Sequence, residues 1–360
     1  MADTSYEFAI FGSTPLAGLL AGLLASVHQK KVCIVGDLPS AFRLVRGIDL
    51  SVMPVTRPET WALLKDGAPE TRKLLGRMGG KSAVRRIDPI FVAETAAGRD
   101  ALAHMRHVAL GFGQAVERLP NAGLEGAVAY RLRDAIFLDS GRVQPAIESW
   151  LRALGVGRVT ARGAKVTLKR DGSARIESGA LNFEAARGVL ADDQALLTHL
   201  DVDERDNTLI SQSVTTMLTE PAYPLMAPVM IYPDRGVTLS QRPSGNIAAL
   251  SAGRPDLATA RIGGCLAAQG HLRPAGQTSF RSVSTIDGAP LVGQAKGVKA
   301  LVVAGLGVGA AFFSPAVARL IAGVATEREQ RYFSAHESGR GSGRAAVAEY
   351  QGALASEAQF

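Results

Sequence analysis

Apolar residues gather in two short runs early in the chain, with a helix-like stretch between them. Residues 7–11 form the first run, Lys31-Val-Cys-Ile-Val35 forms the second, and residues 15–28 are apolar and rich in small side chains. This spacing predicts a strand, a helix and a second strand, which is the βαβ unit of a parallel sheet. The pattern therefore indicates an α/β fold.

The remaining pattern predicts more helices and a second kind of sheet. Helices are expected over 58–75, 98–109 and 143–154, and the last helix over 315–323. Strands of the first sheet are expected over 164–176, 181–191 and 300–304, and a further strand is expected over 87–93. Pro and Gly separate four further strand-like pieces, which predict an antiparallel sheet: 210–219, 229–232, 237–241 and 247–252.

These elements divide into two interleaved domains and a tail. A discontinuous cofactor domain is expected over 1–60, 135–205 and 276–330, and a substrate domain over 61–134 and 206–275. Residues 331–360 remain as a C-terminal extension. Because Ser334 to Gly343 is rich in Ser, Gly and Arg, we expect that stretch to be mobile or bound to a partner.

Composition narrows the classes of partner. The chain has 360 residues, 47% of them hydrophobic and 20% charged, with a formal net charge of +7. The basic residues are scattered and pair only as doublets, which argues against a nucleic-acid-binding face. The two cysteines, Cys33 and Cys265, form neither a metal-ligand spacing nor a disulfide framework, so no metal site is expected. The apolar run 16–25 is too short to cross a bilayer, and we expect a cytoplasmic protein without membrane contact.

Two glycine turns carry the candidate chemistry. The first follows the first strand and places backbone amides and a helix N-terminus at Gly12 to Ala17, where a pyrophosphate can be neutralised. Pro15 suits the first helical turn because its missing N–H costs little there. The second turn lies in Val303-Ala-Gly-Leu-Gly-Val-Gly-Ala-Ala-Phe-Phe-Ser-Pro315. Two such turns almost the whole chain apart predict one discontinuous nucleotide site.

The order of the motifs resembles the FAD-dependent D-amino-acid oxidase superfamily, especially the branch of glycine oxidase, sarcosine oxidase and opine-oxidising subunits. The resemblance covers residues 7–325. It implies a Rossmann-like FAD-binding domain of the glutathione-reductase type, with an antiparallel-sheet substrate domain. The motifs that carry it, besides the two turns, are Ala41-Phe-Arg-Leu-Val-Arg-Gly47, Pro89-Ile-Phe-Val-Ala-Glu-Thr95, Asp139-Ser-Gly-Arg-Val-Gln-Pro145, Leu218-Thr-Glu-Pro221, Gln241-Arg-Pro-Ser-Gly-Asn-Ile247 and Thr285-Ile-Asp-Gly-Ala-Pro-Leu-Val-Gly293.

The resemblance also implies roles for individual residues. Arg281 would clamp the substrate carboxylate in two parallel hydrogen bonds, and Tyr232 would add a second donor. Tyr223, Arg242 and His271 are further substrate-site candidates. The residues expected to bind non-covalent FAD are Gly12, Thr14, Pro15, Ala17, Asp37, Arg43, Gly47, Val166, Gly305, Gly307, Val308, Gly309 and Ala310.

The sequence departs from the family pattern at four places. Thr14 replaces the middle glycine of the fingerprint, and Gly36 replaces the ribose-binding Glu, with Asp37 one position later. Asp192 and Asp193 stand where relatives have Ala-Gly, and two acidic groups beside a pyrophosphate are unfavourable unless they point away. The spacing from Arg281 to Asp287 is one residue longer than in many relatives.

Three functions follow from this reading. The first is an FAD-dependent oxidoreductase that oxidises the C–N bond of a small amino acid, N-methyl amino acid or opine by hydride transfer to flavin N5. The second is a degenerate, non-catalytic or assembly subunit of a multi-subunit flavoenzyme. The third is a flavoprotein that modifies a partner protein. The sequence leaves these alternatives open.

Overall fold

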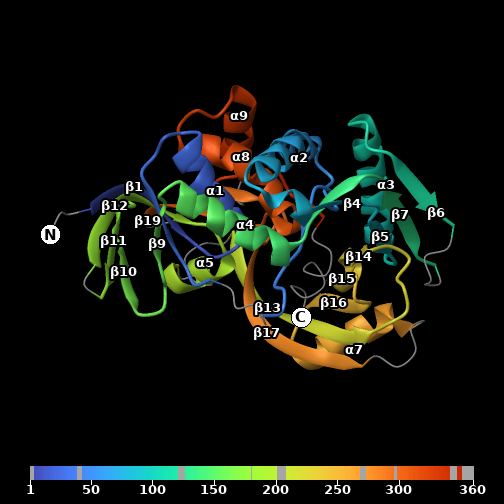
Figure 1. Cartoon of the computed structure of the whole chain (residues 1–360). Helices are drawn as coiled ribbons and strands as arrows, with labels where there is room; N and C mark the ends of the chain where they lie inside the picture. Colours follow the sequence, from blue (N-terminus) through green and yellow to red (C-terminus); the bar gives the residue numbers. More distant parts are fainter. Residues whose placement is uncertain are drawn as a thin grey trace.

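The computed structural model describes residues 4–38, 43–120, 126–179, 181–200, 208–267, 273–295, 298–340 and 347–350. Two large sheets organise these residues (Figure 1), and the second includes the long strands β13 (Leu209–Pro221) and β17 (Pro274–Thr285). The fold is mixed α/β with a parallel sheet and a largely antiparallel sheet, as the sequence predicts.

The first sheet is built on five parallel strands from remote parts of the chain. Strand β12 pairs in parallel with β1 along most of its length and with β19 at its end. Strand β2 lies on the other side of β1, and β9 follows it. The parallel strands are β1 (Thr4–Phe11), β2 (Val32–Val35), β9 (Gly157–Val159), β12 (Leu181–Leu190) and β19 (Val298–Ala304). Antiparallel strands complete the sheet: β10 (Ala164–Leu168), β11 (Ala174–Ser178) and β18 (Leu291–Ala295).

Helices pack closely on one face of this sheet because small residues line their contacts. In α1 (Pro15–Ser26), Gly18 lies against Ile147 and Gly22 against the ring of Trp150, both from α4 (Ser140–Ala153). A Cβ on either glycine would collide with the facing side chain of α4. Helix α8 (Ala310–Ile321) also packs beside α1, α2 (Pro58–Arg77) packs on α8, and α5 (Asp193–His199) follows β12. The 3-10 turn η4 (Gly307–Gly309) leads into α8.

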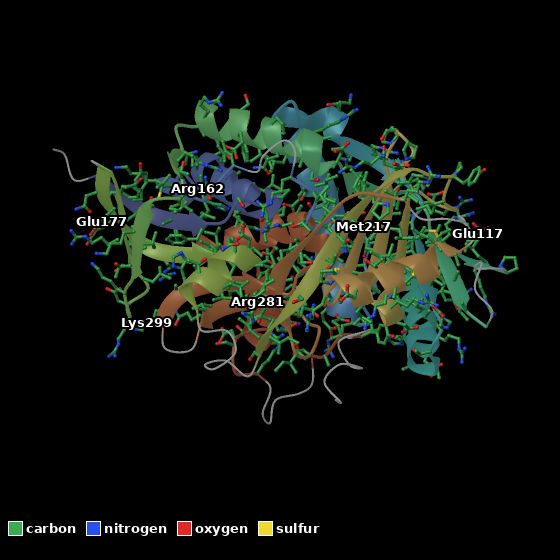
Figure 2. The ribbon with its side chains drawn as sticks, turned by 90° about the horizontal axis from the view of Figure 1, so that it is seen from below. Glu117, Arg162, Glu177, Met217, Arg281 and Lys299 are labelled. Atoms are coloured by element: carbon green, nitrogen blue, oxygen red, sulfur yellow. The ribbon has the colours of Figure 1, made fainter. Side chains whose placement is uncertain are left out.

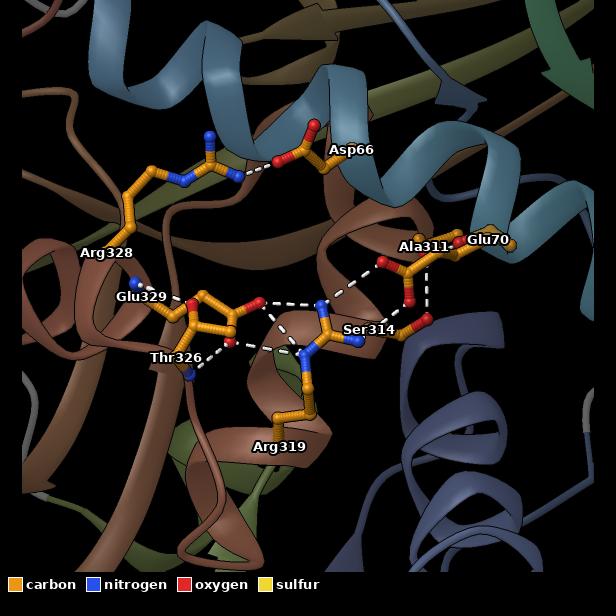
Figure 3. A network of polar contacts seen from close by, with 9 residues as sticks. Asp66, Glu70, Ala311, Ser314, Arg319, Thr326, Arg328 and Glu329 are labelled. Atoms are coloured by element: carbon orange, nitrogen blue, oxygen red, sulfur yellow. Dashed lines mark hydrogen bonds and ion pairs between the residues drawn. The ribbon is translucent and has the colours of Figure 1, made fainter.

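Ion pairs fix α9 (Glu327–Ala335) and α2 to α8, as Figure 3 shows. The Arg319 guanidinium of α8 donates to Glu70 of α2 at 2.7 Å and to Glu329 of α9 at 2.6 Å. Glu329 is buried and also accepts from the backbone N–H of Thr326, which completes a capping box. Arg328 pairs with Asp66 of α2. One arginine therefore joins three helices.

The second sheet runs in the order β17-β13-β16-β15-β14-β5-β7-β6. All its neighbours pair antiparallel except β14 and β5. The strands are β5 (Ile90–Ala93), β6 (Val116–Leu119), β7 (Val128–Leu132), β13 (Leu209–Pro221), β14 (Val229–Tyr232), β15 (Val237–Gln241), β16 (Asn246–Ala252) and β17 (Pro274–Thr285). The helices beside it are α3 (Ala96–Gly111) and α7 (Pro255–Cys265). Smaller elements are the sheet of β3 (Asp49–Leu50), β4 (Val84–Ile87) and β8 (Ala135–Leu138), and the 3-10 turns η1 (Gly80–Ala83) and η2 (Pro233–Arg235).

The structure corrects three expectations from the sequence. Residues 276–285, assigned to the cofactor domain, form part of β17, which pairs with β13 along the second sheet. Residues 61–77, assigned to the substrate domain, lie in α2, which packs against α8. Residues 334–340 pack on the body of the protein, because Arg340 is buried and bonded to Asp287. Residues 341–343 of the expected mobile stretch lie outside the described residues.

The segment 347–350 forms hydrogen bonds to three remote parts of the chain. The Glu349 carboxylate accepts hydrogen bonds from the backbone N–H of Thr56 at 2.6 Å and from that of Arg57 at 3.2 Å. Its own backbone N–H donates to the Asp287 carbonyl, and the neighbouring Tyr350 hydroxyl bonds to Asp234 beside the second sheet. Glu349 is only 6% exposed. Chain segments almost 300 residues apart therefore meet at one buried carboxylate.

Within the described ranges, no helix is both long and apolar enough to span a membrane.

Candidate functional site

The first glycine turn lies where β1 and β2 end, and its backbone geometry demands glycine. Gly12 has φ of +151°, and a Cβ there would lie 2.9 Å from the Cβ of Ala17. A Cβ on Gly36 would collide with the Gly12 carbonyl oxygen. Thr14 N-caps α1, because its hydroxyl accepts from the Ala17 N–H at 3.4 Å, and Pro15 is the first helical residue. The turn therefore presents the positive end of α1 at the carboxyl edge of the sheet.

A carboxylate from β12's end already occupies this turn. Asp192 Oδ2 accepts from the backbone N–H of Ser13 at 2.7 Å, and Oδ1 accepts from that of Ala195 at 2.9 Å, which caps α5. Burial raises the pKa of Asp192, while these hydrogen bonds and the charges of Arg43 and Arg46 act to lower it. The Ser13 N–H of the turn is therefore already bonded to a carboxylate of the protein itself.

The neighbouring Asp193 faces the second sheet. Its carboxylate accepts from the Ser282 hydroxyl at 2.6 Å, and burial raises its pKa to about 6. Phe280 and Ser282 are two positions apart and therefore lie on the same face of β17. The Arg46 guanidinium lies 5.0 Å from the centre of the Phe280 ring. Two arginines, two aspartates and one face of β17 thus converge beside the first glycine turn.

The second glycine turn joins β19 to α8 at the same edge of the sheet. Gly305 and Gly307 have φ of +67° and +52°, and a Cβ on Gly305 would lie 2.9 Å from Thr285. A Cβ on Gly309 would lie 2.9 Å from the Met53 sulfur. Val308 is half-buried, and Ala310 is the first residue of α8. The structure brings this turn to the same edge as the first one, because β19 and β1 flank β12.

A second buried carboxylate lies at the start of α8. Asp49 Oδ1 accepts from the Ala311 N–H at 3.1 Å, and the side chain is 8% exposed. Burial raises the pKa of Asp49 to about 6. Asp49 was not predicted as a site residue, because nothing in the sequence links it to Ala311, which lies 262 positions later.

The two residues expected to bind substrate both lie in strands of the second sheet, Arg281 in β17 and Tyr232 in β14. Arg281 is exposed and hydrogen-bonds to Ser211 (Figure 2), on the face of β17 opposite to Phe280 and Ser282. Tyr232 is 3% exposed and lies in the apolar core with Ile262 of α7. Its hydroxyl donates to the Met230 sulfur at 3.9 Å, and burial raises its pKa.

The other expected residues lie on the edges of the first sheet or on the second. Asp37 is exposed and accepts from the Arg162 backbone N–H at 3.1 Å. Gly47 is exposed with open space around it, Arg43 is exposed, and Val166 lies half-buried in β10. Two further substrate-site candidates, Tyr223 and Arg242, are both exposed, whereas His271 lies outside the described residues. Among the described residues, no group of three or more His, Cys, Asp or Glu side chains could hold a metal ion.

Comparison with known proteins finds similar structures but no similar sequences. No family model matches the chain, and no curated protein matches it in sequence. Glycine oxidase from Geobacillus kaustophilus is similar in structure, with a TM-score of 0.68, 16% identity, and coverage of 91% of this chain and 95% of that one.

Two other solved structures lead to the same fold. L-proline dehydrogenase from P. horikoshii has a TM-score of 0.72 at 13% identity, with 92% of this chain and 97% of that chain covered. Iminodiacetate oxidase from Chelativorans sp. BNC1 has a TM-score of 0.65 at 15% identity, with 88% and 94% covered. The chain therefore shares its fold with these amino-acid-oxidising enzymes, and the mixed α/β fold agrees with the fold class that the sequence predicts.

Proposed function

We propose that the protein is an FAD-dependent oxidoreductase that oxidises the C–N bond of a small amino acid, N-methyl amino acid or opine. The observation that carries this proposal is the meeting of two glycine turns at the carboxyl edge of one parallel sheet. That edge is where parallel α/β sheets bind nucleotides. The similar structures support the substrate class, since their names specify glycine, L-proline and iminodiacetate, each an amine next to a carboxylate.

The backbone of the first turn fits a cofactor diphosphate. Gly12 and Gly36 leave no Cβ at the turn, and the N-terminus of α1 lies directly behind it. Arg43 and Arg46 lie close enough to act on the charge of Asp192 and would neutralise phosphate at the same place. The Ser13 N–H would become available only when Asp192 leaves it. The loop from Gly305 to Ala310 would hold the other end of the cofactor.

When bound, the flavin would supply a hydride acceptor. The chain itself would then have to bind the substrate carboxylate and hold the amine in place. Arg281 remains our proposed carboxylate clamp, and Arg46 is a second candidate, because it lies over Phe280 on the opposite face of β17. Losing a buried charge-assisted pair costs about 2–4 kcal/mol. The affinity of a carboxylate inhibitor for Arg281→Ala and Arg46→Ala identifies which guanidinium binds it.

The test of the proposed function is an absorption spectrum. The protein is purified without added flavin, mixed with FAD and separated from the excess, and a set of amino acids and N-methyl amino acids is then added without oxygen. Flavin absorption that stays with the protein and bleaches with one substrate supports the proposal. A protein that retains FAD but reacts with no amine refutes the substrate class.

One observation favours a second candidate function. The Asp192 carboxylate fills the turn that a diphosphate needs, as expected of a non-catalytic or assembly subunit that keeps the fold without the cofactor. Such a subunit would stay colourless in the same experiment and take up no FAD. Purification from its native source with a flavin-bearing partner would support this candidate.

A further inference from the structure

The contact between Asp192 and the first glycine turn is a built interaction between remote segments. Ser13 and Asp192 are 179 positions apart, and the N–H to Oδ2 distance is 2.7 Å. The same oxygen would lie 3.0 Å from a Cβ on Gly12, so the carboxylate packs directly against the turn. Its other oxygen caps α5 through Ala195. Both carboxylate oxygens therefore have backbone donors.

The carboxylate of Asp192 lies at the N-terminus of α1, a helix with no acidic residue in its own first turn. The first turn of α1 contains no Asp or Glu. A helix N-terminus carries a partial positive charge and is stabilised by an anion. Asp192 supplies that anion from β12's end, with Arg43 and Arg46 as the surrounding cations. This is the arrangement of donors and cations that a bound phosphate would otherwise use.

We propose that Asp192 is an internal competitor of the cofactor diphosphate, so that the cofactor binds only when this carboxylate leaves the Ser13 N–H. The inference rests on the proposed function, and it concerns what controls cofactor uptake at that site. A diphosphate and a carboxylate cannot share one N–H donor, and their charges repel at close range. The affinity of the protein for FAD is therefore set by Asp192 as much as by the residues that contact the cofactor.

Two substitutions isolate this effect. Asp192→Asn removes the charge and keeps an oxygen that can cap α5, and Asp192→Ser does the same with a preferred N-cap residue. Asp193→Asn is the matched control, because it removes an equal charge from the next residue, which bonds to Ser282 rather than to the turn. If only the net charge of the protein mattered, Asp192→Asn and Asp193→Asn would change the affinity for FAD equally.

The experiment is a titration of each full-length apoprotein with FAD, followed by flavin fluorescence. We expect Asp192→Asn and Asp192→Ser to lower the Kd about tenfold, which corresponds to about 1.4 kcal/mol, and Asp193→Asn to change it far less. Thermal unfolding of the apoproteins gives a readout independent of flavin. There Asp192→Asn should unfold at a temperature no lower than that of the wild type, because it removes a charge whose burial is unfavourable.

The outcomes separate the inference from the proposed function. Equal and measurable Kd values for the wild type and both Asp192 variants would overturn the inference and leave the flavin proposal intact. Equal gains for Asp192→Asn and Asp193→Asn would also overturn it, because the turn contact would then be irrelevant. If no variant binds FAD, Asp192 is not what blocks the site, and both ideas fail. Tight binding by the variants with none by the wild type supports the inference and favours the second candidate function.

Discussion

The contact between α2 and α8 allows a sharp test of the packing, through two glycines in the same helix. Gly67 of α2 is buried, and a Cβ there would approach the Phe312 carbonyl oxygen of α8 more closely than real Cβ atoms approach any atom. Because the obstructing atom belongs to the backbone, no side-chain rotation can relieve the contact. Gly76 of α2 is exposed with open space around it, and it serves as the control.

The two alanine substitutions should therefore have opposite signs. Replacing helical Gly by Ala stabilises an unobstructed helix by about 0.5–1 kcal/mol, which is the expected effect of Gly76→Ala. Gly67→Ala makes the same gain but must force α2 away from α8, and overpacking costs about 1–3 kcal/mol or more. We expect a net loss of about 2 kcal/mol.

Urea unfolding of the apoprotein, followed by circular dichroism, measures both effects. The midpoint of Gly67→Ala should fall below that of the wild type and the midpoint of Gly76→Ala should rise above it. A Gly67→Ala protein as stable as Gly76→Ala would mean that the helices do not cross at this distance, and the arrangement of α8 over the sheet would be refuted.

Three further predictions concern buried charges. Burial raises the pKa of Asp49 from its ordinary 3.8 to about 6, so the folded state binds this proton more tightly than the unfolded chain and stability falls as pH rises from about 4 to about 6. Asp49→Asn should therefore exceed the wild type by up to about 3 kcal/mol above about pH 7 and lose this advantage near pH 4, as urea midpoints at both pH values will show. Arg340→Ala leaves Asp287 and three carbonyls without their donor and should cost about 3–5 kcal/mol in the same assay, whereas an unchanged midpoint would contradict the observed burial. Glu349→Ala should release the segment 347–350 and speed its cleavage by a protease, with the exposed Glu327→Ala as control; equal cleavage of both variants would argue against the Thr56 contact.

The periodic pattern predicted the parallel sheet, the antiparallel sheet and most helices, because burial on one face dictates those residues. It misplaced the starts of two helices. The helices predicted to start at residues 143 and 315 begin three and five residues earlier, because α4 starts at Ser140 and α8 at Ala310. Asp139 caps α4 locally, and Asp49 caps α8 from a distant strand. A cap supplied by a remote residue leaves no local signal.

The candidate site was predictable only in its backbone. The glycines of both turns were identified, since a positive φ or a close approach restricts the residue type. The sequence also marked Asp192 and Asp193 as departures, but it did not show that Asp192 would face the Ser13 amide. Nor did it place Arg46 over Phe280, which depends on how a loop lies against a strand from the other end of the chain. Side-chain direction across such distances is set by tertiary packing.

The assembly of the first sheet from remote segments governs when the protein can complete its folding during synthesis. Strands β1, β2, β9 and β12 can pair once about half of the chain has left the ribosome, but β19 and α8 follow more than 100 residues later. Until then, the apolar residues of α1 and α2 that α8 covers remain open to water and to other chains. Pairing between such distant segments is slow. The nascent chain therefore exposes an apolar helix surface until α8 is synthesised. We expect chaperones to bind mainly during that interval.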